Sequence, residues 1–177
     1  MRFDVVTLFP EIFSAVRDCG ITARARMRGL WSMNCWNPRD TATDLHRTID
    51  DRPFGGGPGM VMMAEPLAQT IDAVRASGNR GPILSFAPNG ARLTDARVRE
   101  IAAAKEPIVL VCGRYEGIDE RFLESYVDEV VSLGDFVLSG GELPACALID
   151  AVVRQLPGAI KDLSASDESF ATGLLDA

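Results

Sequence analysis

Two glycine-dense segments contain the residues of this chain best suited to chemistry. Residues 112–119 read Cys-Gly-Arg-Tyr-Glu-Gly-Ile-Asp, and residues 134–144 read Gly-Asp-Phe-Val-Leu-Ser-Gly-Gly-Glu-Leu-Pro. Glycine lets the backbone approach a ligand closely and offer it N–H and C=O groups. Each segment follows a short apolar, β-branched run, so each should begin where a buried strand ends, and open α/β sheets bind ligands there. Together the two segments predict a pocket for one small molecule.

A third segment belongs with these two. Residues 87–90 read Ala-Pro-Asn-Gly after another apolar run, which predicts a turn. For one segment alone, the simpler interpretation is that glycines only end strands and begin helices. Three in succession, with Tyr115, Glu116 and Phe136 among the glycines, favour a cofactor site at one edge of a parallel sheet. None matches Gly-x-Gly-x-x-Gly running into a helix, so a dinucleotide fingerprint is absent.

Cysteine and histidine usage limits the other chemistries. The chain has four cysteines without a Cys-x-x-Cys pair, and His46 is its single histidine, so no zinc ligand set can be identified. Buried free thiols are the better interpretation of the cysteines. A Ser-His-Asp or Cys-His hydrolase would need His46 itself as the base. We therefore expect no metal site, and hydrolase chemistry is disfavoured.

The charge of the chain argues against non-specific nucleic-acid binding. The formal net charge is −7, whereas such binding needs many cationic contacts to phosphates. A local basic patch is still compatible with this charge, because arginines such as Arg24, Arg26 and Arg28 crowd the first third of the chain. Arginine suits recognition of phosphate and guanine, but a coding bias would give the same excess over lysine, and we favour the bias.

Length and composition indicate one domain with its own core. The chain has 177 residues, of which 47% are hydrophobic. The longest stretch without Asp, Glu, Lys or Arg, residues 53–64, is short of a membrane span and is broken by glycine and proline. Asp4 lies where a signal peptide needs an apolar core, so we expect a cytoplasmic protein that does not engage a membrane.

Alternating strand and helix patterns predict the elements that position these segments. Strands are expected at residues 3–8, 30–36, 82–86, 108–112 and 129–133, and helices at 10–19, 22–28, 65–77, 94–104, 119–125 and 144–156. The apolar strand at 108–112 is typical of a parallel sheet covered on both faces. The order of the elements predicts an α/β fold.

Residues 37–63 are expected to form a long loop. Within it, Asp50-Asp51 is interpreted as a solvated turn rather than a cation site. The glycine run at 55–59 lacks the preceding strand and the following Lys-Ser or Lys-Thr of a phosphate loop. Because loops of this length are usually functional or disordered, a mobile lid and a plain flexible loop are the two interpretations.

The helix expected at 144–156 is apolar on nearly all sides, so it should be buried within the fold or against another subunit. Asp150 and Arg154 lie one turn apart and share its polar face. They could form a surface ion pair of little energetic weight. Alternatively, Arg154 could hold an anionic oxygen beside the pocket, and the residues alone do not separate these two interpretations.

Three segments together resemble a known family. Residues 51–60, 112–119 and 134–144 are similar, in content and order, to the bacterial tRNA (guanine-N1)-methyltransferases that modify position 37, beside the anticodon. The resemblance extends over effectively the whole chain. It implies transfer of a methyl group from S-adenosylmethionine to N1 of guanosine 37 in tRNA. The alternatives are a non-catalytic RNA-binding or scaffold remnant of this fold and an NAD-binding oxidoreductase, which the missing fingerprint disfavours.

The resemblance implies a SPOUT-type fold and an obligate homodimer. In this fold a parallel sheet is flanked by helices and its C-terminal part is threaded into a deep trefoil knot. Knots are rare in proteins, and nothing in the periodicity of the chain indicates one. By motif, the resemblance assigns S-adenosylmethionine binding to Phe86, Ala87, Pro88, Gly113, Tyr115, Glu116, Ser132, Leu133, Gly134, Asp135, Phe136, Val137, Leu138, Gly140, Gly141 and Pro144.

The resemblance also assigns the catalytic residues. Guanine N1 carries a proton, so the reaction needs a base and a group that stabilises charge on O6. Arg154 matches the family's charge-stabilising arginine. The family's base is an aspartate in a Ser-x-x-x-Asp-Ser-Phe pattern, whereas residues 164–170 read Ser-Ala-Ser-Asp-Glu-Ser-Phe. Glu168 therefore holds the position of the base, and Asp167 is the alternative.

Finally, the resemblance divides the chain. Residues 1–160 correspond to the S-adenosylmethionine-binding methyltransferase domain, and residues 161–177 to an active-site segment that leads, in the family, to a helical tRNA-binding domain. That C-terminal domain is absent from this chain, so we expect cofactor binding but poor methylation of tRNA. The family's magnesium dependence adds Mg²⁺ as an expected cofactor, although no ligand set for it is visible.

Overall fold

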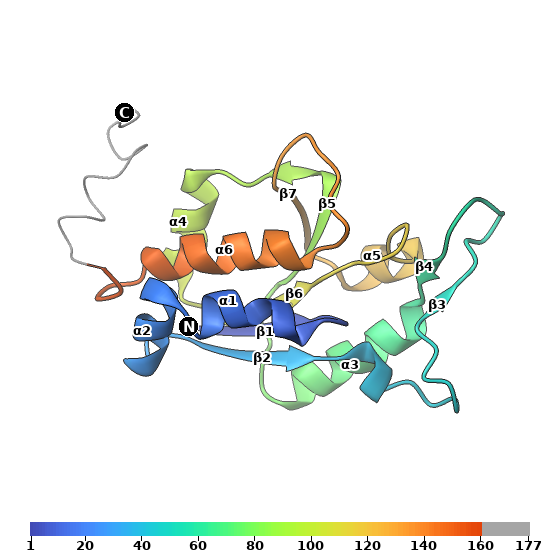
Figure 1. Ribbon diagram of the computed structural model, residues 1–177, viewed down its shortest axis with the longest axis horizontal. Coiled ribbons are helices and arrows are strands. Elements are labelled where there is room, and N and C mark those ends of the chain that lie inside the picture. The colour runs from blue at the N-terminus through green and yellow to red at the C-terminus, as the bar shows by residue number, and fades with distance from the viewer. Residues whose placement is uncertain (161–177) are drawn as a thin grey trace.

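The computed structural model describes residues 1–160, which contain a five-stranded sheet with helices on both faces (Figure 1). Neighbouring strands are all parallel, in the order β2-β1-β6-β5-β7. Their bounds are β1 Arg2–Val6, β2 Ser32–Trp36, β5 Ile83–Arg92, β6 Ile108–Val111 and β7 Glu129–Ser132. The predicted α/β class, with a parallel sheet flanked by helices, is confirmed, and the trefoil knot stays a prediction.

The predicted helices are present, with ends set by local signals. Thr94 caps α4, because its side chain accepts from the Arg97 backbone N–H. The segment that begins at Pro10 starts as a short 3₁₀ turn and becomes α-helical only at Ser14. The bounds are η1 Pro10–Phe13, α1 Ser14–Arg17, α2 Gly20–Met27, η2 Pro38–Asp40, α3 Ala64–Ala76, α4 Asp95–Ala104, α5 Glu120–Tyr126 and α6 Glu142–Arg154.

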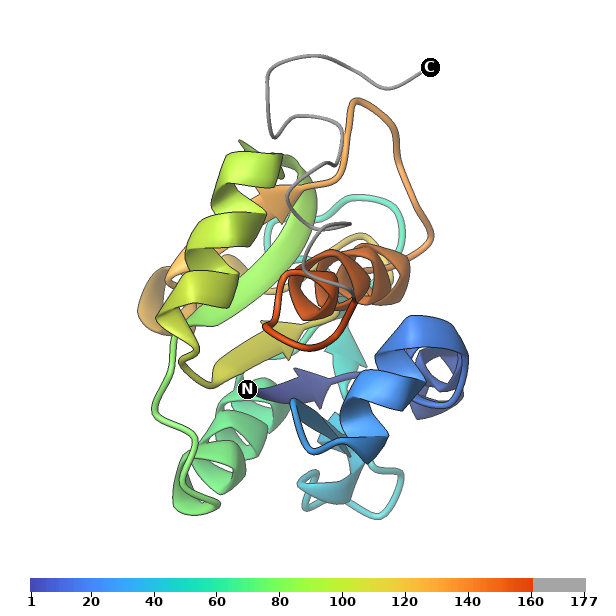
Figure 2. The same cartoon turned by 90° about the vertical axis from the view of Figure 1, so that its left-hand side faces the viewer.

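The sheet separates two apolar layers. Along β6 the side chains alternate, so Leu110 packs among residues of α1, α2, α4 and α6, while Val109 and Val111 pack among residues of α3 and α5. Figure 2 shows α3 and α6 on opposite sides of the sheet. Both clusters consist of fully or almost fully buried side chains, which explains why the β6 sequence is continuously apolar.

The turn predicted at residues 87–90 is wrong, because β5 continues through it to Arg92. Phe86 and Ala91 both pair with Val131 of β7, so the residues between them bulge out of the register. A bulge tolerates Pro88, which has no N–H to donate. Proline and glycine here shape a strand instead of ending it.

The loop predicted at residues 37–63 contains more structure than expected. Asp50 and Asp51 form β3 rather than a solvated turn, and they pair antiparallel with Met62 and Val61 of β4 (Val61–Met62). The pairing leaves residues 52–60 as a connection between two short strands. The two aspartates could not be identified as a strand from propensity, because aspartate is depleted in strands.

Helix α6 is buried within the fold itself. Leu148, Ile149, Val152 and Val153 have no exposed surface and belong to the larger apolar cluster. The helix begins at Glu142, two residues before the predicted start at Pro144. Glu142 is a buried acid in the first turn, where a negative charge interacts favourably with the free N–H groups of the helix.

A buried carboxylate, Asp4 in the middle of β1, ties this strand to β2 and to the connection after α3. It accepts hydrogen bonds from Arg2 at 3.0 Å, Asn34 at 3.2 Å, Trp36 at 2.8 Å and Asn79 at 2.7 Å. Burial opposes the ionised form, but these hydrogen bonds outweigh it and lower the pKa of Asp4. Asp4 is therefore a charged structural group, and it lies outside the predicted pocket.

Candidate functional site

A cavity of about 520 Å³ lies beside the bulged part of β5 and at the carboxyl ends of β6 and β7. This volume is within the range of roughly 300–1,000 Å³ usual for small-molecule sites. Three segments form most of its wall: residues 85–89 of β5 (the first loop), residues 113–118 after β6 (the second loop) and residues 132–141 after β7 (the third loop). Because these strands are adjacent and parallel, segments far apart in the sequence meet at one edge of the sheet.

Nearly all residues predicted to bind the cofactor line this cavity. Asp135 is the exception, although both of its neighbours do line it. Residues that line it and were not predicted are Ser85, Asn89, Arg114, Gly117, Ile118, Glu120, Leu123, Glu124, Val130, Val131 and Ser139. Most adjoin the predicted ones, so contiguity along each loop was the signal available for them. No signal in the sequence identified the residues of α5, because only folding of the chain brings that helix to the cavity.

Backbone conformation in the second loop is unusual. Tyr115 has a φ of 61°, which is a strained conformation for a bulky side chain and one that clusters at functional sites. The Glu116 N–H donates to Met60 O and the Met62 N–H donates to Gly117 O, both at 2.9 Å. The end of the glycine-rich 52–60 segment is thus attached to the second loop.

Tyr115 also connects the cavity to its surroundings. Tyr115 lines the cavity, and 45% of its surface is exposed. Burial and the negative charge of Asp50 raise the pKa of the Tyr115 hydroxyl, and Arg39 opposes that change. A second cavity of about 320 Å³ is lined by Arg39 and shares Arg114, Tyr115 and Ser139 with the first cavity.

Glycines of the third loop allow close approach of backbone segments. A Cβ on Gly141 would lie 2.8 Å from Cys112 Cα, so no side chain fits there. The Gly141 N–H donates to Gly113 O at 2.9 Å, which joins the second and third loops directly. A Cβ on Gly134 would lie 2.6 Å from the Phe136 ring. The glycines thus allow the second and third loops to pack closely against each other at the cavity.

The charges on the cavity wall are mainly negative. Glu116, Glu120 and Glu124 line the cavity, and Arg114 is the cation among the lining residues that the structure describes. Glu120 and Glu124 lie one turn apart on α5. Such a wall suits a ligand that carries positive charge.

Comparison with known proteins identifies the family. The family model for tRNA (Guanine-1)-methyltransferase TrmD matches residues 1–177. The chain belongs to this family. It is 60% identical to the tRNA (guanine-N(1)-)-methyltransferase of Thiobacillus denitrificans, over 99% of this chain and 76% of that protein. It is 56% identical to the corresponding protein of Pseudomonas syringae pv. tomato, over 99% of this chain and 71% of that protein.

A solved structure supports the TrmD fold. The tRNA (m1G37) methyltransferase from Aquifex aeolicus superposes with a TM-score of 0.84 at 41% sequence identity. The match covers 92% of this chain and 72% of the Aquifex chain. The family resemblance drawn from the three glycine-containing segments is confirmed.

Arg154 is the one predicted catalytic residue that lies within the described part of this TrmD chain. Arg154 is in the last turn of α6, and its helix begins at the cavity with Glu142. Twelve residues separate the two, which is about 18 Å along a helix axis. Arg154 is therefore at the far end of α6 from the cavity of its own chain. Asp167 and Glu168 lie outside the described residues.

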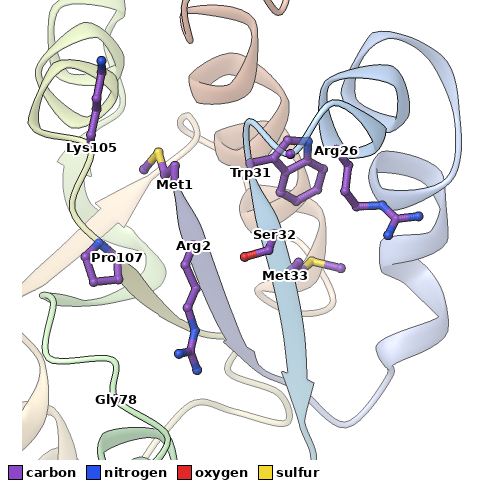
Figure 3. A pocket seen from close by; sticks show the side chains of 10 residues that line it. Met1, Arg2, Arg26, Trp31, Ser32, Met33, Gly78, Lys105 and Pro107 are labelled. Carbon is purple, nitrogen blue, oxygen red and sulfur yellow. The ribbon is translucent and has the colours of Figure 1, made fainter.

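A larger cavity of about 680 Å³ lies at the opposite, amino-terminal edge of the sheet (Figure 3). Its arginines are already engaged, because Arg2 pairs with Asp4 at 2.7 Å and Arg26 with Asp18 at 3.4 Å. Loops that follow parallel strands do not reach this edge. The smaller cavity is therefore the better candidate for the cofactor of the TrmD chain.

The described residues also bear on the predictions for metal ligands, membrane spans and cysteines. Among residues 1–160, no group of three or more His, Cys, Asp or Glu side chains is arranged to hold a metal ion. No helix in this part of the chain is both long and apolar enough to cross a membrane. All four cysteines are free thiols as predicted, but the prediction that they are buried holds only for Cys112, because Cys19 is exposed and Cys35 and Cys146 are half-buried. Burial together with the nearby charge of Glu142 raises the pKa of the Cys112 thiol well above the ordinary value.

Proposed function

We propose that this TrmD chain transfers a methyl group from S-adenosylmethionine to N1 of guanosine 37 in tRNA. One observation carries the proposal. The segments that resemble the family's cofactor motifs come together around one cavity from the bulge of β5 and from the ends of β6 and β7. The NAD-binding alternative lacks the glycine fingerprint and has no support from the family match.

The cavity fits S-adenosylmethionine in size, backbone and charge. Gly113, Gly140 and Gly141 present backbone without side chains on its wall, and Phe86, Pro88 and Leu138 add apolar surface. The acidic wall of Glu116, Glu120 and Glu124 complements a sulfonium cation. When bound, S-adenosylmethionine supplies the methyl group. The chain's own residues bind it, orient it and exclude water.

The proposal includes a homodimer in which Arg154 serves the cavity of the partner copy. The distance along α6 argues for this arrangement, because Arg154 is about 18 Å from the helix start that lies at its own cavity. In a two-fold dimer the same residue of each copy can complete the other's site. There Arg154 would stabilise negative charge on guanine O6.

The proton on guanine N1 requires a base. We assign this role to Glu168, with Asp167 as the alternative, on the pattern of residues 164–170. Either carboxylate would accept the N1 proton as the methyl group is transferred. Dependence on Mg²⁺ and a cytoplasmic location complete the proposal, and both rest on the family resemblance.

A radiolabelled methyl-transfer assay tests this function. tRNA with guanosine at position 37 should accept the methyl group, and the same tRNA with adenosine there should not. Arg154→Ala and Glu168→Ala should each lower kcat by about a hundredfold or more, as loss of a charge-stabilising group or base does.

A loss of activity in Asp167→Ala and not in Glu168→Ala would assign the role of the base to Asp167. Unchanged rates in both acidic variants would contradict the mechanism, and absence of transfer with detectable tRNA binding would favour the non-catalytic alternative.

A further inference from the structure

A buried ion pair joins the loops at one end of the cavity. The Arg114 Nε and the Glu142 Oε2 lie 2.9 Å apart, and the side chain of Glu142 is 1% exposed. Arg114 belongs to the second loop, and Glu142 begins α6 directly after the third loop. The pair therefore connects the two loops through their side chains.

Further contacts surround this pair. The Thr7 Oγ1, just past the end of β1, donates to the Glu142 Oε1 at 3.0 Å. The Arg114 Nη1 donates to Ser139 O of the third loop at 3.1 Å, and its guanidinium lies over the Phe9 ring, 4.5 Å from the centroid. One guanidinium and one carboxylate thus hold the chain after β1, the second loop and the third loop together.

The third loop is built around this pair. A Cβ on Gly140 would overlap the Arg114 Nε and would lie 2.7 Å from the Glu142 Oε2. Glycine at position 140 is therefore required by the pair and not only by a ligand. A buried ion pair is weak support for overall stability, because desolvation offsets its attraction, but it can fix a geometry.

We propose that Arg114 and Glu142 are positioning residues for the cofactor cavity. Their ion pair sets the distance between the second and third loops, and Thr7 holds the carboxylate in place. The proposal rests on the proposed function for the identity of the ligand. It assigns neither residue a contact with the reacting atoms.

Calorimetry with S-adenosylmethionine tests this role on the 177-residue chain. Glu142→Gln keeps the volume and removes the charge, and Arg114→Met keeps most of the side-chain stem. Each should weaken binding by about tenfold or more, because the loops are no longer held at the binding distance. The double variant should bind about as well as the weaker single variant, since both changes remove one interaction. Thr7→Ser should retain the affinity of the wild type, while Thr7→Val should lose part of it.

A matched control separates positioning from general stability. Arg97 forms an ion pair with Glu129 at 2.6 Å, which joins α4 to β7 away from the three loops. Arg97→Gln should leave the affinity for S-adenosylmethionine within about twofold of wild type, because the cavity geometry does not depend on it. In turnover assays the loop variants should raise KM for S-adenosylmethionine much more than they lower kcat.

The outcomes are distinguishable. If the wild type does not bind S-adenosylmethionine, the proposed function fails. If the wild type binds and both Glu142→Gln and Arg114→Met bind within about twofold of it, the positioning role is wrong. Hydrogen exchange adds a direct readout, since amides in residues 113–118 and 132–141 should exchange faster in Glu142→Gln while those of α4 are unchanged. The proposal would also be overturned if the exchange rates of all three segments were the same in Glu142→Gln as in the wild type.

Discussion

At the scale of single residues, Asp4 and Glu142 are two buried carboxylates with different tasks. Asp4 receives four side-chain donors in the middle of β1, whereas Glu142 joins loops at the cavity. Both are acidic side chains removed from water, which proteins retain only when hydrogen bonds or opposite charges compensate them. Apart from Arg2, their partners come from distant segments, so neither role is visible in the sequence around them.

Asp4→Asn should lower the free energy of unfolding by about 2 kcal/mol at neutral pH, because a charged acceptor of buried hydrogen bonds is lost. Chemical denaturation of the two proteins measures the difference. Asp18→Asn is the control, since Asp18 pairs with Arg17 at the surface and should contribute much less to the free energy of unfolding. A smaller loss at Asp4 than at Asp18 would contradict the assignment.

The contribution of Asp4 to the free energy of unfolding should decrease on acidification. The folded pKa of Asp4 is lowered from the ordinary value of 3.8, so its ionised form is favoured by folding. The stability difference between wild type and Asp4→Asn should be constant above that value. It should shrink as the pH falls from there through the lowered folded pKa. Denaturation series between pH 7 and pH 2 would measure it, and a difference that grows on acidification would disprove the sign.

The residues that line the cavity could be predicted where the sequence has glycine at the end of a strand. Gly113, Gly134 and Gly141 were identified with the cavity because glycine at a strand end indicates close backbone approach. Arg114 and Glu142 lie in the same segments and were missed as a pair, because an ion pair across 28 positions has no sequence signature. Glu120 and Glu124 were missed because the sequence does not show which face of α5 meets the cavity.

At the scale of elements, the bulge in β5 is where sequence patterns misled. Pro88 and Gly90 usually end strands, yet here the strand continues and pairs with β7 on both sides of the bulge. Strands and helices with strong apolar periodicity were predicted within a few residues, β6 and α4 among them. Strands β3 and β4 have two residues each, too few for a periodic signal.

The bulge provides a prediction for Gly90. A Cβ at this position would lie 2.5 Å from the Val130 carbonyl oxygen, which is backbone and cannot move independently. Gly90→Ala should therefore lower the free energy of unfolding by about 2 kcal/mol or more, through a forced shift of β5 against β7. In Gly113→Ala the new methyl group would meet only the end of the Ile118 side chain, at 3.2 Å, so the loss should be smaller. Thermal unfolding of the two variants compares them, and equal losses would contradict this account.

At the scale of the whole molecule, the position of Arg154 is the reason for proposing a second copy of the chain. The sequence predicts that α6 is buried either within the fold or against a subunit, and the structure places Leu148, Ile149, Val152 and Val153 of this helix in the core. The resemblance placed Arg154 in the reaction, but the helix length separates it from its own cavity. A site divided between copies cannot be recognised from one chain's periodicity, because symmetry is not encoded in it.

Mixed dimers test this division. Arg154→Ala removes the arginine, and Ala87→Trp fills the cavity, so dimers of either variant alone should be inactive. In a statistical mixture half of the dimers pair one open cavity with an intact Arg154 from the other copy, which predicts about a quarter of wild-type activity. If Arg154 acted on its own cavity, the mixture would stay inactive. Methyl transfer by the separate and mixed proteins decides between the two.

The hydrogen bond between Thr7 and Glu142 joins groups 135 positions apart. A chain emerging from the ribosome exposes the first of them long before the second is made. Strands β1 and β5 are likewise separated in the sheet by β6, so β1, β2 and β5 cannot form one continuous sheet until β6 has been made. The cofactor site is thus completed late in synthesis, after α6 has formed. S-adenosylmethionine cannot guide the early folding of this protein, and can stabilise only a chain that is already assembled.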